Sequence, residues 1–226
     1  MFPLKDENPS RRRPVVTWAL IAVNFAVFIL TLATGVFEQT IEEFGMRPAE
    51  IVGGKNLHTL ITSMFLHGGF FHIIGNMWYL WIFGDNVEDL LGRGKFILFY
   101  IGCGLAADAL HILSDPSSPI PTIGASGAIS GVLGAYALIY PRAKVHTLLT
   151  LGYFWHVAMI PAAAFLGFWF ILQFISMSIT WILPGSSNVA YLAHIGGFIA
   201  GAVVAFPLWA RRKSRRVYMI EFTTHG

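Results

Sequence analysis

Residues Val15–Leu32 read VVTWALIAVNFAVFILTL, a run of eighteen residues without a charged side chain. A helix needs about 20 mostly apolar residues to cross a lipid bilayer. Two other segments have a similar character. One is Phe96–Leu113, which is interrupted by Asp108 and His111, and the other is Val189–Ala210. These three segments predict that the chain crosses a membrane as helices.

The composition of the whole chain agrees with a membrane protein. Of its 226 residues, 55% are hydrophobic and 12% are charged, whereas soluble domains contain about 25% charged residues. The single cysteine, Cys103, excludes an intramolecular disulfide and a cysteine-based metal cluster. The formal charge is only +3, and the basic residues stand beside apolar runs. This pattern indicates membrane topology rather than binding to nucleic acid.

Three further segments decide how often the chain crosses. Phe70–Phe83 and Ala125–Tyr140 are shorter and contain polar or small residues, and Thr147–Leu183 is 37 residues long. If the long segment crosses once, the chain has six spans and both termini lie on one side. Under that topology only Arg47 and Lys55 lie on the opposite side.

The other thirteen of the 15 basic residues lie on the side of the termini: Lys5, Arg11, Arg12, Arg13, Arg93, Lys95, Arg142, Lys144, Arg211, Arg212, Lys213, Arg215 and Arg216. Lys and Arg are enriched in cytoplasmic loops. Both termini are therefore expected in the cytoplasm. A second crossing by the long segment would export the basic residues at 211–216.

These assignments predict an all-α membrane protein with a six-transmembrane-helix bundle. Residues 1–14 form a cytoplasmic segment, residues 15–210 form the membrane domain, and residues 211–226 form a cytoplasmic basic tail. Thr147–Ala158 is expected to lie along the inner interface, with the fifth span starting near Pro161. The first span is expected to be a retained signal anchor. The connection over residues 35–65 is expected to contain short helices at the outer interface.

Polar residues inside the predicted spans are candidates for function, because polar groups are costly in hydrocarbon. His72 and Asn76, in HGGFFHIIGNM, share one helix face at i and i+4. They could hydrogen-bond a neighbouring helix or belong to a site. His67 is expected to be a structural loop histidine that donates to backbone. Asp108 is expected to be structural, in contact with His111.

Ser126 opens the fourth predicted span within GASGAISG. Gly127 and Gly131 form a GxxxG pair, which favours close helix packing. The sequence also resembles GxSxG, but the hydrolase elbow requires a preceding strand, and none is expected here. Taken alone, the segment is explained by helix packing, and GxSxG by itself is only a weak indication of a nucleophile.

His194 opens the sixth predicted span within AHIGGFIAG, where Gly197 and Gly201 form a second GxxxG pair. The fourth and sixth helices are therefore expected to pack together. In the six-span topology Ser126, His194 and Asn76 all lie roughly 3 to 10 Å below the outer boundary. A serine and a histidine suffice for nucleophilic catalysis when the imidazole accepts the hydroxyl proton.

HGGFFHIIGNM, GASGAISG and AHIGGFIAG together resemble the three signature segments of the rhomboid intramembrane serine proteases. The resemblance implies a rhomboid-like six-helix bundle with a catalytic dyad of Ser126 and His194. It implies an oxyanion site formed by His72, Asn76 and the backbone N–H of Ser126. It further implies that single-span transmembrane proteins are cleaved near their outer ends, without a metal or cofactor.

One feature departs from the resemblance. Many rhomboids have a Trp-Arg pair before the second span, where this chain has His58-Thr59. With six spans and no large soluble domain expected, the chain resembles the minimal form common in bacteria. This form implies a bacterial cytoplasmic membrane.

Two other functions remain open from the sequence. A non-catalytic protein of the same fold would hold membrane clients without cutting them, but the presence of both Ser126 and His194 argues against this. A transporter would need polar residues along the full depth of the bundle, whereas the candidates gather in the outer half. In a protease, water must reach the site through a cavity open to the outside. The fifth helix and the Pro184–Asn188 loop are expected to be the movable elements.

Overall fold

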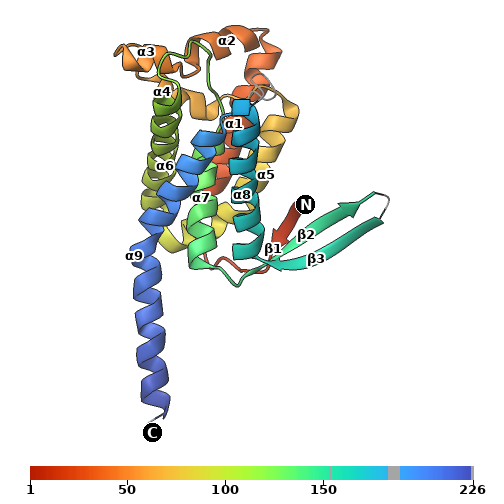
Figure 1. The fold of residues 1–226 in the computed structure, drawn as a ribbon, viewed down its shortest axis with the longest axis vertical. Coiled ribbons are helices and arrows are strands. Elements are labelled where there is room, and N and C mark those ends of the chain that lie inside the picture. The colour runs from red at the N-terminus through yellow and green to blue at the C-terminus, as the bar shows by residue number, and fades with distance from the viewer. Residues whose placement is uncertain (153, 183–188, 225–226) are drawn as a thin grey trace.

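The computed structural model describes residues 1–152, 154–182 and 189–224. Six helices of fourteen residues or more form a bundle in this part of the chain (Figure 1). They are α1 (Val15–Ala33), α5 (Phe70–Leu91), α6 (Arg93–Ser114), α7 (Ser126–Ile139), α8 (Ala162–Ile182) and α9 (Tyr191–Thr224). Each overlaps one of the apolar segments predicted from the sequence, and α8 begins directly after Pro161.

Four of these helices are long and apolar enough to cross a membrane, namely α1, α6, α8 and the Tyr191–Arg211 part of α9. Helix α7 is apolar but has only 14 residues. Helix α5 mixes apolar residues with His72, Asn76 and Asp85. The chain is therefore mostly helical and has the spans of an integral membrane protein.

Short helices occupy the connection between α1 and α5, as the sequence predicts. They are α2 (Phe37–Phe44), α3 (Pro48–Val52), α4 (Thr59–Thr62) and the 3₁₀ helix η1 (Ser63–Phe65). Figure 1 shows α2, α3 and α4 at one end of the bundle, with the C-terminal part of α9 extending beyond the other end. The two ends of the molecule are therefore built differently.

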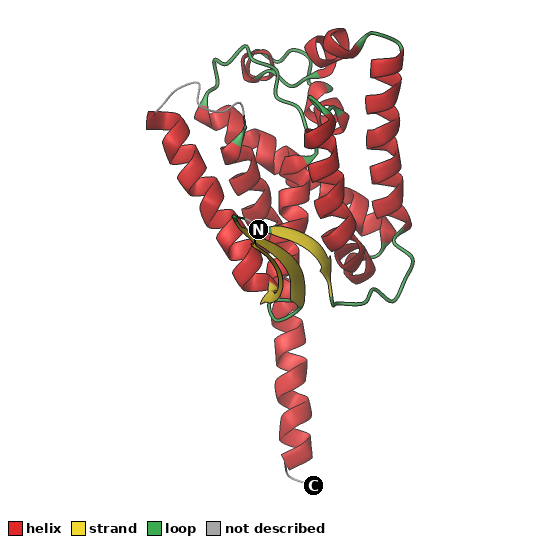
Figure 2. Ribbon diagram, turned by 90° about the vertical axis from the view of Figure 1, so that its right-hand side faces the viewer, coloured by secondary structure: helices red, strands yellow, loops and turns green. Residues whose placement is uncertain are grey.

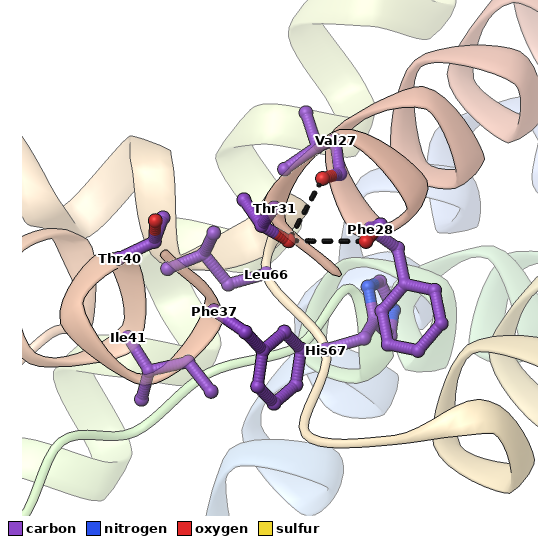
Figure 3. Close-up of a pocket in the computed structure, with 8 residues that line it drawn as sticks. All are labelled: Val27, Phe28, Thr31, Phe37, Thr40, Ile41, Leu66 and His67. Carbon is purple, nitrogen blue, oxygen red and sulfur yellow. Dashed lines mark hydrogen bonds between the residues drawn. The ribbon is translucent and has the colours of Figure 1, made fainter. Parts of the chain in front are cut away.

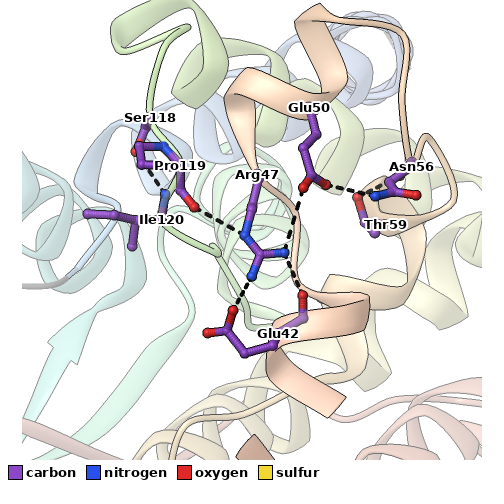
Figure 4. A network of polar contacts seen from close by, with 8 residues as sticks. All are labelled: Glu42, Arg47, Glu50, Asn56, Thr59, Ser118, Pro119 and Ile120. Atoms are coloured by element: carbon purple, nitrogen blue, oxygen red, sulfur yellow. Dashed lines mark hydrogen bonds and ion pairs between the residues drawn. The ribbon is translucent and has the colours of Figure 1, made fainter. Parts of the chain in front are cut away.

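Arg47 ties the short helices to the segment that precedes α7 (Figure 4). Its guanidinium donates to the carbonyl oxygen of Pro119 at 3.1 Å and to Glu42, and it lies 4.0 Å from a carboxylate oxygen of Glu50. Glu50 in turn accepts a hydrogen bond from Asn56 at 2.9 Å. One cation therefore joins three parts of the chain at this end of the bundle.

A small antiparallel sheet corrects the all-α prediction. Its strands are β1 (Phe2–Asp6), β2 (Lys144–Leu151) and β3 (Phe154–Pro161), in the order β1-β2-β3. Figure 2 shows the three strands curving together beside the helices. Val145 and Thr147 are fully buried, and this spacing of two residues is the period of a strand with one covered face. The prediction for 147–158 identified no strand.

The N-terminal segment is held to the bundle by specific contacts. Trp78 Nε1 donates to the carbonyl oxygen of Pro3 at 2.7 Å. The buried Glu88 accepts from the backbone N–H groups of Val16 at 3.0 Å and Thr17 at 2.7 Å, and from the Thr17 hydroxyl at 2.8 Å. A carboxylate thus satisfies unpaired N–H groups at the start of α1. This contact requires α5 to continue beyond Phe83, where the apolar segment ends.

Helix α7 is the centre of the bundle, and eleven of its fourteen residues are buried. Its backbone packs directly against the backbone of α9, with no side chain between them. A Cβ atom added to Gly197 would lie 2.0 Å from the carbonyl oxygen of Gly127, and one added to Gly201 would lie 1.9 Å from that of Gly131. No side chain larger than hydrogen fits at these positions. The predicted packing of the two GxxxG pairs is therefore confirmed.

Candidate active site

The segment that leads into α7 is held by hydrogen bonds from three directions. Thr122 pairs with Met46 through two backbone hydrogen bonds of 2.8 and 3.0 Å. The Thr122 hydroxyl also lies 2.9 Å from His111 Nε2. The Gly124 N–H donates to the carbonyl oxygen of Ser63 at 2.9 Å. Ser126, the first residue of α7, is therefore presented from a firmly anchored turn.

Gly124 brings His72 next to Ser126. Its φ of +124° lies in a region that favours glycine. A Cβ atom at this position would lie 2.9 Å from His72 Nε2 and 3.7 Å from Ser126 Oγ. The imidazole of α5 and the hydroxyl of α7 thus face the same small space, which exists because residue 124 has no side chain.

His72 presents a hydrogen-bond donor to this space. The backbone N–H of Gly68 donates to His72 Nδ1 at 3.3 Å, so Nδ1 acts as an acceptor. A neutral imidazole carries one N–H, which places the proton of His72 on Nε2, the nitrogen beside Gly124. His72 is therefore oriented to donate toward the surroundings of Ser126.

Asn76 lies one turn after His72 on α5. Its side-chain Nδ2 is buried and has no hydrogen-bond partner within the described part of the chain. Buried amide donors are normally paired, because leaving one unpaired costs about 1–3 kcal/mol. The free donor of Asn76 is compatible with a partner that is present only during a reaction.

The packing of α7 on α9 brings together the two chain segments that contain Ser126 and His194. Gly127, which follows Ser126, faces Ala193, which precedes His194. A Cβ atom on Gly127 would lie 3.9 Å from the carbonyl oxygen of Ala193. In the described structure the Ser126 hydroxyl donates no hydrogen bond to His194. Instead, His194 Nδ1 lies 2.9 Å from Gln173 Oε1 of α8.

Gln173 was not identified from the sequence. It is a lone amide within the long apolar segment over residues 147–183. The histidines were identified as candidates because polar groups are costly inside a membrane span. The same rule applies to Gln173.

His67 lies in the loop before α5, as predicted, but the predicted bond to the backbone is not formed within hydrogen-bonding geometry in the described part of the chain. Its side chain is buried, and neither ring nitrogen has a hydrogen-bond partner among the described residues. Its ring centroid lies 5.0 Å from that of His72. Burial, together with repulsion from His72, lowers the pKa of His67 to about 3, which keeps the imidazole neutral. His67 is therefore a packing neighbour of His72 rather than a backbone donor.

His67 also borders a small apolar cavity between α1, α2 and the segment before α5 (Figure 3). Phe28 and Phe37 contribute aromatic rings to its wall, and Thr31 hydrogen-bonds within its own helix to the carbonyl oxygens of Val27 and Phe28. Neither Ser126 nor His194 lines this cavity. The predicted water-filled cavity at Ser126 and His194 stays a prediction.

The predicted contact between Asp108 and His111 is also wrong. His111 Nε2 pairs with the Thr122 hydroxyl, and Asp108 Oδ2 is buried without a hydrogen-bond partner among the described residues. His111 thus helps to hold the segment before Ser126. The Pro184–Asn188 loop, predicted to be a movable cap, lies outside the described residues.

Comparison with known proteins matches residues 54–211 to the Rhomboid domain family. The chain belongs to the rhomboid family. It is 31% identical to the Rhomboid protease GluP of Bacillus subtilis over 198 residues, which cover 87% of this chain and 35% of that protein. The matched region of this rhomboid includes His72, Asn76, Ser126 and His194.

Two mitochondrial relatives show the same relationship. Rhomboid protein 1 of Saccharomyces cerevisiae is 26% identical over 196 residues, covering 83% of this rhomboid and 51% of the yeast protein. The human Presenilin-associated rhomboid-like protein is 26% identical over 196 residues, covering 86% and 48%. The chain therefore spans between about a third and a half of the length of these relatives.

Proposed function

We propose that this rhomboid is an intramembrane serine endopeptidase that cleaves single-span transmembrane proteins near the outer face of the membrane. The observation that carries the proposal is the backbone contact between α7 and α9. It places Gly127 against Ala193, and these two residues directly neighbour Ser126 and His194. Membership of a family that includes a named protease supports the same activity.

In the proposed reaction, Ser126 Oγ attacks the carbonyl carbon of the scissile peptide bond. His194 Nε2 accepts the hydroxyl proton as the Oγ–C bond forms. The protonated imidazole then gives this proton to the leaving amine as the C–N bond breaks. Water attacks the acyl-enzyme with His194 again as base, which releases the carboxylate product and restores the Ser126 hydroxyl.

The negative charge of the tetrahedral intermediate needs donors that are already in place. We assign this role to His72 Nε2, Asn76 Nδ2 and the backbone N–H of Ser126. The tautomer of His72 and the unpaired amide of Asn76 support the assignment. The start of α7 adds unpaired N–H groups and the positive end of a helix dipole.

The proposed topology has six crossings with both termini in the cytoplasm of a bacterial cell. In this arrangement α5, α7 and α9 run inward from the outer face, and α2 to α4 lie at that face. Reporter fusions at Gly226 and in the Arg142–Lys144 connection should be cytoplasmic, and a tag beside Lys55 should be external. An external C-terminus would overturn this topology.

The activity is tested by incubating the purified protein in liposomes with a single-span substrate. Wild-type protein should release two fragments cut near the outer end of the substrate span. Ser126→Ala and His194→Ala should each abolish cleavage while leaving the melting temperature close to wild type. Their effects should not add in the double variant, because both residues serve one proton transfer.

Robust cleavage by the Ser126→Ala protein would contradict the serine mechanism. A wild-type protein that binds the substrate tightly without cutting it would instead indicate a client-binding rhomboid.

A further inference from the structure

Gln173 is the feature around the catalytic histidine that the proposed mechanism does not use. It lies on α8, and its Oε1 is 2.9 Å from His194 Nδ1 on α9. An amide inside an apolar helix is costly unless it is hydrogen-bonded. Gln173 meets this requirement by bonding to the residue that serves as the proposed general base.

A second hydrogen bond fixes which way the Gln173 amide faces. Its Nε2 donates to the backbone carbonyl oxygen of Trp169 at 3.3 Å. A carbonyl oxygen can only accept, so the nitrogen of the amide must face Trp169 and the oxygen must face His194. His194 Nδ1 is therefore the donor of the bond to Gln173.

This orientation determines the tautomer of the catalytic histidine. A neutral imidazole carries a single N–H. With the proton on Nδ1, the lone pair lies on Nε2, which is the nitrogen that must accept the proton of the Ser126 hydroxyl. The opposite tautomer would present an N–H to Ser126 and could not act as the base.

Aromatic rings hold the imidazole from two other directions. The ring centroid of Trp169 lies 6.0 Å from that of His194 at an interplanar angle of 32°, and that of Tyr191 lies 6.4 Å away at 90°. Trp169 and Gln173 are four residues apart on α8, so one face of this helix makes both contacts.

We propose that Gln173 is a positioning residue that completes a Ser126–His194–Gln173 triad by holding the imidazole in the tautomer and orientation of the general base. The inference rests on the proposed serine mechanism. A neutral amide orients the ring as a carboxylate would, but it adds no negative charge to stabilise the imidazolium. The His194 imidazole would then stay unprotonated at a lower pH than the imidazole of an enzyme whose third residue is a carboxylate.

Other titratable groups surround His194 as well. His72 on α5 faces Ser126 across Gly124, and His111 lies on α6, which packs against α9. Asp108 lies one turn before His111, and Tyr191 contacts the imidazole from the same helix. All four are left unchanged in the variants below, so differences between variants report on residue 173.

Gln173→Leu removes the acceptor while keeping an apolar side chain of similar volume. The imidazole is then free to adopt the other tautomer or to turn away. We expect kcat to fall about 10- to 100-fold with little change in KM, since misplacing a catalytic group by about 1 Å costs on this order.

Gln173→Glu keeps the acceptor and adds a negative charge. The carboxylate favours the imidazolium, which cannot accept the proton of Ser126. The acidic limb of the kcat/KM profile should therefore move to higher pH, and activity on the alkaline side should approach that of wild type. A side chain that only fills space would produce neither the shift nor this rescue.

Ser178→Ala is the matched control on the same helix. The Ser178 side chain is exposed, and its hydroxyl donates to the carbonyl oxygen of Phe174 at 2.9 Å within α8. Losing this bond tests whether any polar substitution in α8 lowers activity. The control should show the wild-type kcat and pH profile.

The experiment measures kcat, KM, the pH profile and the melting temperature of wild type and these three variants with one single-span substrate. A wild-type protein without activity would overturn the proposed function itself. An active wild type whose Gln173→Leu variant has an unchanged kcat would overturn only the positioning role. The role would also be overturned if Gln173→Glu followed the wild-type pH profile, or if both variants lost activity only in proportion to lost folded protein.

Discussion

Helices α7 and α8 are both apolar, yet they meet opposite surroundings. Helix α7 is rich in Gly and Ala, and its side chains are buried almost throughout. Helix α8 is rich in large side chains, and residues such as Phe168, Ile171 and Ile175 are exposed. Small residues allow neighbouring helices to approach to backbone distance, whereas large ones cover a lipid-facing surface. Hydropathy alone does not distinguish the two roles, but residue size does.

The candidate site takes residues from both kinds of helix. Ser126 lies on the central helix α7, which packs so closely on the backbone of α9 that neither helix can shift toward the other. Gln173 reaches His194 from the peripheral helix through one hydrogen bond. We therefore expect changes in the α7–α9 contact to affect the fold, and changes beside it to affect catalysis.

The largest effect should come from Gly197→Ala. The new Cβ would lie 2.0 Å from the carbonyl oxygen of Gly127, so α7 and α9 would have to separate. Overpacking costs about 1–3 kcal/mol even where side chains can yield, and here the obstacle is backbone. With about 2–4 °C per kcal/mol for a chain of this size, the melting temperature should fall by about 10 °C. A melting temperature equal to wild type would contradict the close packing.

Gly124→Ala should leave the bundle folded but lower kcat by about 100-fold or more, because the added Cβ would collide with His72 Nε2 at 2.9 Å. Gly35→Ala is the matched control. Gly35 also has a positive φ, of +73°, but nothing lies within 4 Å of its Cβ position. Both variants therefore place alanine at a positive φ. Only Gly124→Ala should lose activity in a cleavage assay. Equal kcat values in the two variants would argue against crowding at the site.

Asn76→Ala should lower kcat by about 10- to 1000-fold, which is the range expected for loss of one oxyanion donor. Since Asn76 Nδ2 has no partner within the described structure, KM and the melting temperature should change little. Two donors would remain, so the loss should be smaller than for Ser126→Ala. A large fall in melting temperature, with activity lost in parallel, would assign Asn76 to packing.

The smallest effect is expected on the peripheral helix. Gly167→Ala in α8 adds a Cβ with nothing within 4 Å. Alanine is favoured over glycine in a helix by about 1 kcal/mol, so the melting temperature should rise by about 2–4 °C. The same substitution would then have opposite signs in α8 and α9. A marked destabilisation by Gly167→Ala would remove the distinction between central and peripheral helices.

Much of the helical fold could be predicted from the sequence. Apolar runs together with the distribution of Lys and Arg predicted the six long helices, Pro161 marked the start of α8, and the two glycine pairs predicted that α7 packs on α9. The ends of the helices were harder to predict, because an apolar run shows where the membrane-spanning part ends, and the helix can continue beyond it. Glu88 lies beyond the apolar part of α5, and its bonds to the start of α1 depend on a contact far away in sequence.

The sheet and Gln173 were missed for different reasons. Val145 and Thr147 follow a strand period. β2 pairs with the neighbouring β3 on one side and with the N-terminal Phe2–Asp6, about 140 residues away along the chain, on the other. The pairing with β1 cannot be deduced from local pattern. Gln173 was visible as a polar residue in an apolar segment, but only the fold brings it to His194. Which nitrogen of His194 carries the proton follows from hydrogen bonds that the sequence does not contain.

The most direct test of the central claim is the mass-spectrometric mapping of a fluorophosphonate adduct. In this reaction Ser126 Oγ forms a bond to phosphorus, fluoride leaves, and His194 takes the hydroxyl proton. We predict stoichiometric modification of Ser126 in the wild-type protein and none at that residue in the folded His194→Ala variant. Modification of a different serine, or equal modification of Ser126 with and without His194, would contradict the account.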